Sequence, residues 1–156
     1  MPSPRAGFAV GALLSVAAVG AALVSQHVYD MQPCPWCVLQ RLVFVAIAAA
    51  CVLGLLWTGR AGRAAAALLT LALAAGGVAS AVYQNQVAAK SESCAFTFPE
   101  RFIAATGLDG WLPDVFQARA SCIDAAVDLL GVPYEFYSLA LFLLIGAGSI
   151  ALLRRG

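Results

Sequence analysis

The chain has 156 residues, of which 62% are hydrophobic and 11% are charged, and its formal net charge is +1 at pH 7. A water-soluble domain of this size needs many more polar and charged residues to cover its surface, so the composition excludes one. The sequence also contains no basic cluster and no phosphate-binding glycine loop, so nothing in it indicates a nucleic acid as a partner.

Four runs of the sequence lack Asp, Glu, Lys and Arg, and each is near or above the roughly 18 residues of a candidate membrane-spanning helix. These runs predict spans at about residues 7–28, 37–58, 64–86 and 136–153. A short loop of about residues 29–36 and a long loop of about residues 87–135 are expected on the same side of the membrane. The predicted fold is an all-α, four-helix transmembrane bundle, with residues 1–156 as a single membrane domain.

The first span has a competing interpretation as a cleaved signal peptide. Arg5 would be its basic region, and alanine-rich residues near position 22 would precede the cleavage site. However, the charge-free run from Ala6 to Tyr29 is longer than the roughly 7–15 apolar residues of a signal core. We therefore expect this helix to be retained.

The second span is preceded by the motif Cys34-Pro35-Trp36-Cys37. Two intervening residues permit a small, reversible disulfide ring, and such motifs lower the pKa of one thiol. Pro35 suits the first turn of a helix, because its missing N–H has no partner there. If a helix begins here, both cysteines lie at its positive end, where a thiolate is stabilised. The motif therefore favours a redox-active pair.

Other chemistries fit this motif less well. A structural disulfide remains an alternative. A zinc site would need two more Cys or His ligands, and His27 is the only histidine. Haem attachment would need a histidine directly after Cys37, where the chain has Val38. We expect no metal.

Arg41 follows Cys37 by four positions, so the two side chains share one face of the predicted helix. A charged residue at the edge of a span either extends to the membrane surface or marks a site. Beside a thiol pair, a guanidinium could donate to a quinone carbonyl and stabilise the negative charge that develops there. Cys51 lies about 21 Å further along the helix, so we expect only a small buried side chain there.

The second loop carries Cys94 and Cys122, so that four of the five cysteines fall in the two loops on one side. Apolar residues at helical spacing also predict a short helix at the bilayer surface, with a packed loop segment as the alternative. These residues are Trp111, Leu112, Val115 and Phe116.

The charges indicate the orientation of the bundle. All eight acids lie on the loop side together with four basic residues. The short segments on the opposite side are purely basic; they hold Arg5, Arg60, Arg63, Arg154 and Arg155. Short basic segments face the cytoplasm. We therefore expect both termini in the cytoplasm and the cysteine loops in the periplasm, where disulfides persist, across a bacterial inner membrane.

Two stretches of the sequence resemble the DsbB family of disulfide-bond formation proteins. The first outer loop of that family is similar to Gln26-His27-Val28 followed by Pro33-Cys34-Pro35-Trp36-Cys37-Val38-Leu39-Gln40-Arg41, and its second loop to Trp111-Leu112-Pro113-Asp114-Val115-Phe116 and Cys122. Four spans, with a CxxC first and a separated cysteine pair second, agree as well. The resemblance thus covers nearly the whole chain.

This resemblance implies a disulfide oxidase of the inner membrane. Cys34 and Cys37 would adjoin a quinone, ubiquinone or menaquinone, with Cys37 as the thiolate at its ring and Arg41 as the arginine of the quinone site. Cys94 would be attacked by a periplasmic, thioredoxin-fold partner resembling DsbA, and Cys122 would be released to exchange with Cys34.

Two features stay open under this resemblance. The segment Gln84 to Ser93 lacks the prolines of the family, which leaves the shape of the second loop and any quinone contacts at the end of the third span unsettled. His27, at the outer end of the first span, could contribute to quinone binding or proton supply, or it could only end the helix.

Two rival functions remain. Vitamin K epoxide reductase is also a four-helix, quinone-linked thiol enzyme, but there the loop pair precedes the CxxC, the reverse of the order here. A membrane scaffold whose disulfides only brace its loops would give Arg41 no purpose, and its disulfides would resist mild reductant.

Overall fold

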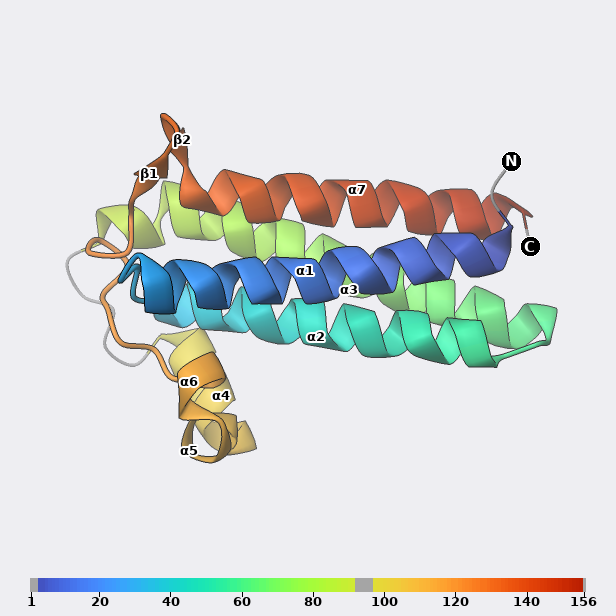
Figure 1. Cartoon of the computed structure of the whole chain (residues 1–156), viewed down its shortest axis with the longest axis horizontal. Coiled ribbons are helices and arrows are strands. Elements are labelled where there is room, and N and C mark those ends of the chain that lie inside the picture. The colour runs from blue at the N-terminus through green and yellow to red at the C-terminus, as the bar shows by residue number, and fades with distance from the viewer. Residues whose placement is uncertain (1–2, 92–96, 156) are drawn as a thin grey trace.

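The computed structural model describes residues 3–91 and 97–155 and consists mainly of four long helices lying side by side (Figure 1). Each helix is long and apolar enough to cross a membrane. The four-helix prediction is therefore confirmed. The helices are α1 (Pro4–Val28), α2 (Pro35–Leu56), α3 (Arg60–Gln86) and α7 (Tyr134–Arg155).

Local capping decides where these helices begin. The Ser3 side chain accepts a hydrogen bond of 3.3 Å from the N–H of Ala6, and Pro4 occupies the first turn of α1. At α2 the same arrangement is made by Cys34 and Pro35. The first three helices begin two to four residues before the spans expected from sequence. The expected spans come from charge-free runs, which mark the apolar segment but do not include the capping residues that start each helix.

The bundle interior is filled by aromatic and aliphatic side chains that interlock with small residues. The rings of Phe44 and Phe142 stack with their centroids 4.1 Å apart, and both side chains are buried. Gly77 gives space to Phe142, and Gly54 gives space to Phe8, since a Cβ at either glycine would overlap the ring. The apolar side chains exposed on the outside, such as Leu13 and Leu144, suit contact with lipid.

The long second loop contains several short elements at one end of the bundle. They are η1 (Ala88–Lys90), α4 (Phe98–Thr106), α5 (Leu108–Trp111), α6 (Pro113–Phe116), β1 (Asp128–Leu129) and β2 (Val132–Pro133). Helices α4 to α6 form an arm that projects sideways from the bundle (Figure 1). The arm is attached by Ile103 and Phe116, which pack on Val38 of α2.

The short helix expected around Trp111 to Phe116 differs from the structure in one respect. The segment is helical, but it is divided into α5 and α6 at Leu112, whose φ of −131° and ψ of 68° lie outside the helical region. The next residue is Pro113, and proline disfavours the helical conformation of the residue before it. The longest helix of the arm is instead α4, which the sequence analysis did not predict.

Candidate active site

The Cys34–Cys37 motif forms the first turn of α2. Cys34 is the N-cap, and its Sγ accepts a hydrogen bond of 3.3 Å from the N–H of Cys37. The Sγ atoms of the two cysteines lie 2.9 Å apart. The side chains are thus adjacent at the positive end of a long helix, as expected from the position of Pro35.

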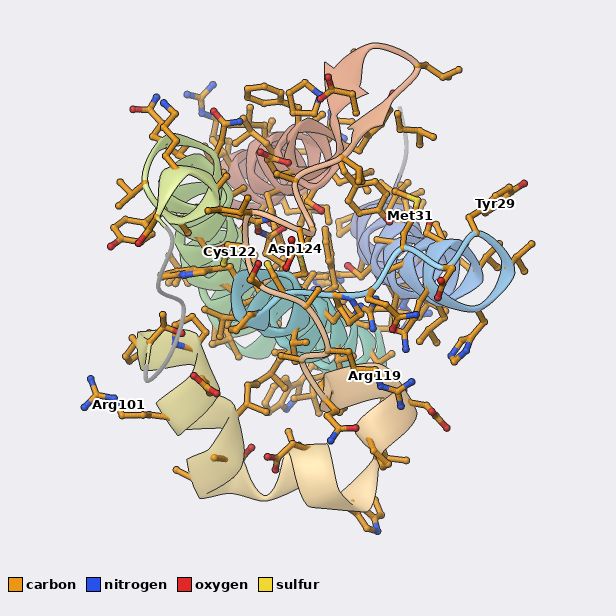
Figure 2. All side chains as sticks on the ribbon, turned by 90° about the vertical axis from the view of Figure 1, so that its left-hand side faces the viewer. Tyr29, Met31, Arg101, Arg119, Cys122 and Asp124 are labelled. Carbon is orange, nitrogen blue, oxygen red and sulfur yellow. The ribbon has the colours of Figure 1, made fainter. Side chains whose placement is uncertain are left out.

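The second loop brings Cys122 to this pair. The backbone N–H groups of Arg119 and Ala120 both donate to the carbonyl of Pro33, at 2.9 and 3.2 Å, which ties the loop to the residue before Cys34. Cys34 and Cys122 pack in one cluster, and their exposed fractions are 0% and 1%. Figure 2 shows Cys122 near the end of α2, over the middle of the bundle.

The surroundings of Cys34 favour its protonated form. Hydrogen bonding with Cys122 and Cys37, together with burial, holds the pKa of the Cys34 thiol above its ordinary value of 9.0. Cys34 is therefore a thiol rather than a thiolate at neutral pH when all three cysteines are reduced.

Cys51 does not take part in this cluster. Cys94 lies outside the described residues. Cys51 is buried in the bundle core, with its Sγ 3.8 Å from the hydroxyl of Thr70. Its position agrees with the small buried side chain expected there.

Arg41 is buried inside the protein, with 6% of its surface exposed. Its Nη1 donates to the Oε1 of Gln26 at 2.7 Å and to the carbonyl of Val115 at 3.1 Å. Its Nη2 donates to the carbonyl of Ala22 at 3.3 Å. The guanidinium therefore joins α1, α2 and the loop arm at one point.

A cavity of about 290 Å³ lies beside this arginine, between α1, α2, α3 and α7. Its polar lining includes Cys37, Gln40, Arg41 and Gln84, and the rest is largely apolar, with Phe44 and several alanines. The Nε2 of Gln84 donates to the Sγ of Cys37 at 3.4 Å, and the Nε2 of Gln40 donates to the Oε1 of Gln84 at 2.7 Å. A chain of amides thus orients a donor toward Cys37.

These residues fit the quinone that the sequence predicts. The apolar walls suit a ring and its tail, and Arg41 and Gln84, which line the cavity together with Cys37, carry donors that could bind a ring carbonyl. Gln26 accepts from Arg41 but does not line the cavity, and its buried Nε2 has no hydrogen-bond partner among the described residues. Arg41 and Gln84 would hold such a ring next to Cys37.

Several residues of this site were not predicted as site residues from the sequence. Gln26, Gln40 and Gln84 are buried polar side chains near the ends of apolar spans, and that position was the available signal. Glu135 also lines the cavity; it is 4% exposed and accepts from the Nδ2 of Asn85 at 2.7 Å. His27, in contrast, is exposed and does not line the cavity.

Comparison with known proteins gives consistent matches along the chain. A family model described as "Disulfide bond formation protein DsbB" matches residues 4–152. A "Disulfide bond formation protein B" from Ralstonia nicotianae is 32% identical over 160 residues, which cover 97% of this chain and 95% of that protein. The "Disulfide bond formation protein B 2" of Pseudomonas aeruginosa is 37% identical over 157 residues, covering 94% and 89%. A further relative, from Aromatoleum aromaticum, is 34% identical over 140 residues, covering 88% and 84%.

Proposed function

Since the chain belongs to the DsbB family of disulfide bond formation proteins, and is thus a membrane disulfide oxidase, we propose that it transfers electrons from a periplasmic dithiol protein to a membrane quinone. The donor is a DsbA-like protein with a thioredoxin fold, and the acceptor is ubiquinone or menaquinone. The observation that carries this proposal is a series of neighbouring groups. Cys122 packs with Cys34, Cys34 adjoins Cys37, and Cys37 lines the cavity beside Arg41.

The first exchange takes place between the partner and the second loop. A thiolate of the partner attacks the Cys94 sulfur of a Cys94–Cys122 disulfide, which forms a mixed disulfide and releases Cys122 as a thiolate. The second thiolate of the partner then attacks the partner's own sulfur atom in this mixed disulfide. This step releases the Cys94 thiolate and leaves the partner oxidised.

The second exchange takes place between the two loops. The Cys122 thiolate attacks Cys34 of the Cys34–Cys37 disulfide and releases the Cys37 thiolate into the cavity. The Cys94 thiolate then displaces Cys34 from Cys122, which restores the Cys94–Cys122 disulfide and leaves Cys34 and Cys37 reduced. The cluster of Cys34 with Cys122 supports this route, because a sulfur must approach the disulfide it attacks.

A bound quinone would accept two electrons and two protons, which returns Cys34 and Cys37 to a disulfide. The residues of this chain prepare that step. The Nε2 of Gln84 donates to the Cys37 sulfur, and the guanidinium of Arg41 favours negative charge beside it. The apolar walls exclude water from the thiol pair.

Two cysteine pairs are useful because the two reaction partners reside in different phases. A DsbA-like donor is a strong oxidant, with a reduction potential of about −120 mV, so an ordinary protein disulfide would not reoxidise it. One pair must meet this soluble protein, whereas the other must meet a ring dissolved in lipid. Electron transfer to a quinone can drive the whole sequence.

The proposed setting is the bacterial inner membrane, with both termini in the cytoplasm and both cysteine loops in the periplasm. The arginines at the ends of α1, α3 and α7 support this orientation, since short basic segments remain in the cytoplasm.

The experiment that tests the function is optical measurement of quinone reduction by the purified chain in detergent, with a reduced DsbA protein as donor. We expect turnover that requires both the donor and the quinone. Cys37→Ser and Cys94→Ser should each abolish it, and Cys51→Ser, in the core, should not. Normal turnover by Cys37→Ser would refute the assignment, and disulfides that resist the donor would indicate a scaffold.

A further inference from the structure

The end of the bundle opposite the cysteines contains a second hollow, of about 220 Å³, formed by three helices. Pro4 and Phe8 of α1, Leu152 and Leu153 of α7, and Ala64 of α3 supply its apolar lining. Arg60 and Arg63 of α3 and Arg155 of α7 supply its charge, and its described lining contains no acidic side chain. Both termini and the turn between α2 and α3 lie at this end (Figure 1).

This combination of charge and apolar surface matches one class of ligand. Basic pockets between transmembrane helices, at the membrane surface, bind the head groups of anionic phospholipids. The guanidinium of Arg63 makes no hydrogen bond or ion pair within residues 3–91 and 97–155, so all its donors remain available. Arginine donates in a planar fork that matches the geometry of a phosphate.

A tryptophan close to the hollow in sequence favours a position at the depth of lipid head groups. Trp57 is the C-cap of α2, three residues before Arg60, and is half exposed. Tryptophan is enriched at the head-group level of a bilayer. Its ring is held against Gly62, where a Cβ would come within 2.7 Å of it. The first turn of α3 contains no acid and its N-cap, Gly59, has no capping side chain, so the helix dipole adds to the positive potential.

We propose that this hollow binds the phosphodiester head group of one anionic phospholipid. Arg63 and Arg155 hold the phosphate from α3 and α7, and Phe8 forms the apolar floor. The volume accommodates a head group and not the whole lipid, so the acyl chains extend outward along the lipid-facing surface. The bound lipid links α1, α3 and α7 at the end of the bundle and stabilises the folded state by mass action.

Native mass spectrometry of the full chain in detergent tests this site. Phosphatidylglycerol and phosphatidylcholine with identical acyl chains are added separately, and the bound lipid is counted. We expect one phosphatidylglycerol to be retained, with a dissociation constant about tenfold or more below that of phosphatidylcholine. Equal retention of the two lipids would overturn the proposal.

Two double variants distinguish binding in the hollow from general attraction of anionic lipid to this positively charged end of the bundle. Arg63→Gln/Arg155→Gln removes two charges from the lining, and Arg5→Gln/Arg154→Gln removes two charges of the same end that do not line the hollow. The first variant should bind phosphatidylglycerol about tenfold or more weakly, and the second should bind as the unchanged chain does. Equal weakening in both variants would contradict a defined site.

Two further arms keep the proposal testable if the arginine variants fold poorly. Ala64→Phe fills the hollow and leaves every charge in place; it should abolish preferential binding, and unchanged binding would exclude the hollow as the site. Inorganic phosphate in excess should not displace the lipid, because it lacks acyl chains. Displacement by phosphate would show a site for free anions instead of a lipid site.

Discussion

Cys34 combines two roles, since it caps α2 and also contacts two other sulfur atoms. The cap fixes the position of its Sγ at the helix end, and the tie between the second loop and Pro33 brings Cys122 to it. Arg41, four residues further along α2 than Cys37, is fixed in the same way by three oxygen acceptors from other segments. At both positions, groups distant in sequence contribute to the chemistry of the residue.

The raised pKa of Cys34 gives a prediction for the fully reduced protein. The measurement is the ultraviolet absorbance of the thiolate, taken as the difference between the reduced chain and reduced Cys34→Ser. Cys34 should titrate at a pH above its ordinary pKa of 9.0. The folded state holds this proton more tightly than the unfolded state does. Its contribution to stability is therefore complete below pH 9.0 and is lost as the pH rises above that value. Titration of Cys34 at the same pH in the folded and the denaturant-unfolded chain would contradict this.

Arg41→Ala should weaken the use of quinone more than the use of the donor. The change removes a charged donor beside the cavity, and hydrogen bonds to charged groups contribute about 1.5–3 kcal/mol, so we expect the KM for quinone to rise about tenfold or more. Arg41→Lys should be intermediate, because an ammonium cannot reproduce the planar fork. Steady-state kinetics with each substrate varied in turn measures the effect, and Arg101→Ala, on the exposed face of α4, is the control. An unchanged KM with a reduced kcat would show that Arg41 does not bind the quinone.

At the scale of elements, the helices are held together by close fits between rings and small residues. Gly77 of α3 faces the ring of Phe142, which is itself stacked on Phe44. The neighbouring Gly76 has no atom within 4 Å of the position that a Cβ would take. Two adjacent glycines on one helix therefore have different environments.

Gly77→Ala should destabilise the bundle, whereas Gly76→Ala should not. A Cβ at Gly77 would lie 2.5 Å from Phe142, whose ring cannot move away because it is buried. Overpacking of this kind costs about 1–3 kcal/mol, whereas alanine in place of an unhindered helix glycine stabilises by about 0.5–1 kcal/mol. Thermal unfolding in detergent should give a lower midpoint for the first variant only. Equal midpoints would show that α3 and α7 are less closely packed than described.

At the scale of the whole molecule, the second loop both carries the arm formed by α4 to α6 and closes over the end of α2. Ile103 and Phe116 attach the arm to Val38, and Arg119 and Ala120 attach the following segment to Pro33. The loop is thus positioned by α2, the helix that carries the first cysteine pair.

The contact between the loops predicts a specific cross-link. A variant that keeps only Cys34 and Cys122, with Cys37, Cys51 and Cys94 changed to Ala, should form a disulfide under mild oxidation. After cleavage of the chain at Arg60 or Arg63, the two fragments should stay joined until a reductant is added. A variant that keeps only Cys51 and Cys122 should separate, because Cys51 lies in the bundle core. Separation of the Cys34 and Cys122 fragments under oxidising conditions would exclude the proposed exchange.

The sequence by itself determined the number of long apolar helices and the class of protein, whereas the chemistry of the first cysteine pair stays a prediction. A long run without charged residues favours insertion, because its transfer from water into the membrane is favourable. A proline after an N-cap residue favours the start of a helix. Both effects depend only on residues close together in the sequence. The spacing of Cys37 and Arg41 likewise placed both on one helix face. The division of the loop helix at Leu112 also has a local cause, Pro113, but the apolar spacing predicted a single continuous helix there.

Only the tertiary structure decided what these residues contact. The approach of Cys122 to Cys34, the burial of Arg41 against Gln26, and the amide chain from Gln40 to Cys37 join segments that are distant in sequence. No periodicity encodes such contacts, because they depend on the path of the second loop and on which helices are neighbours. The hollow lined by Arg63 and Arg155 arises in the same way, since residues that read as separate basic segments meet only when α3 and α7 pack together.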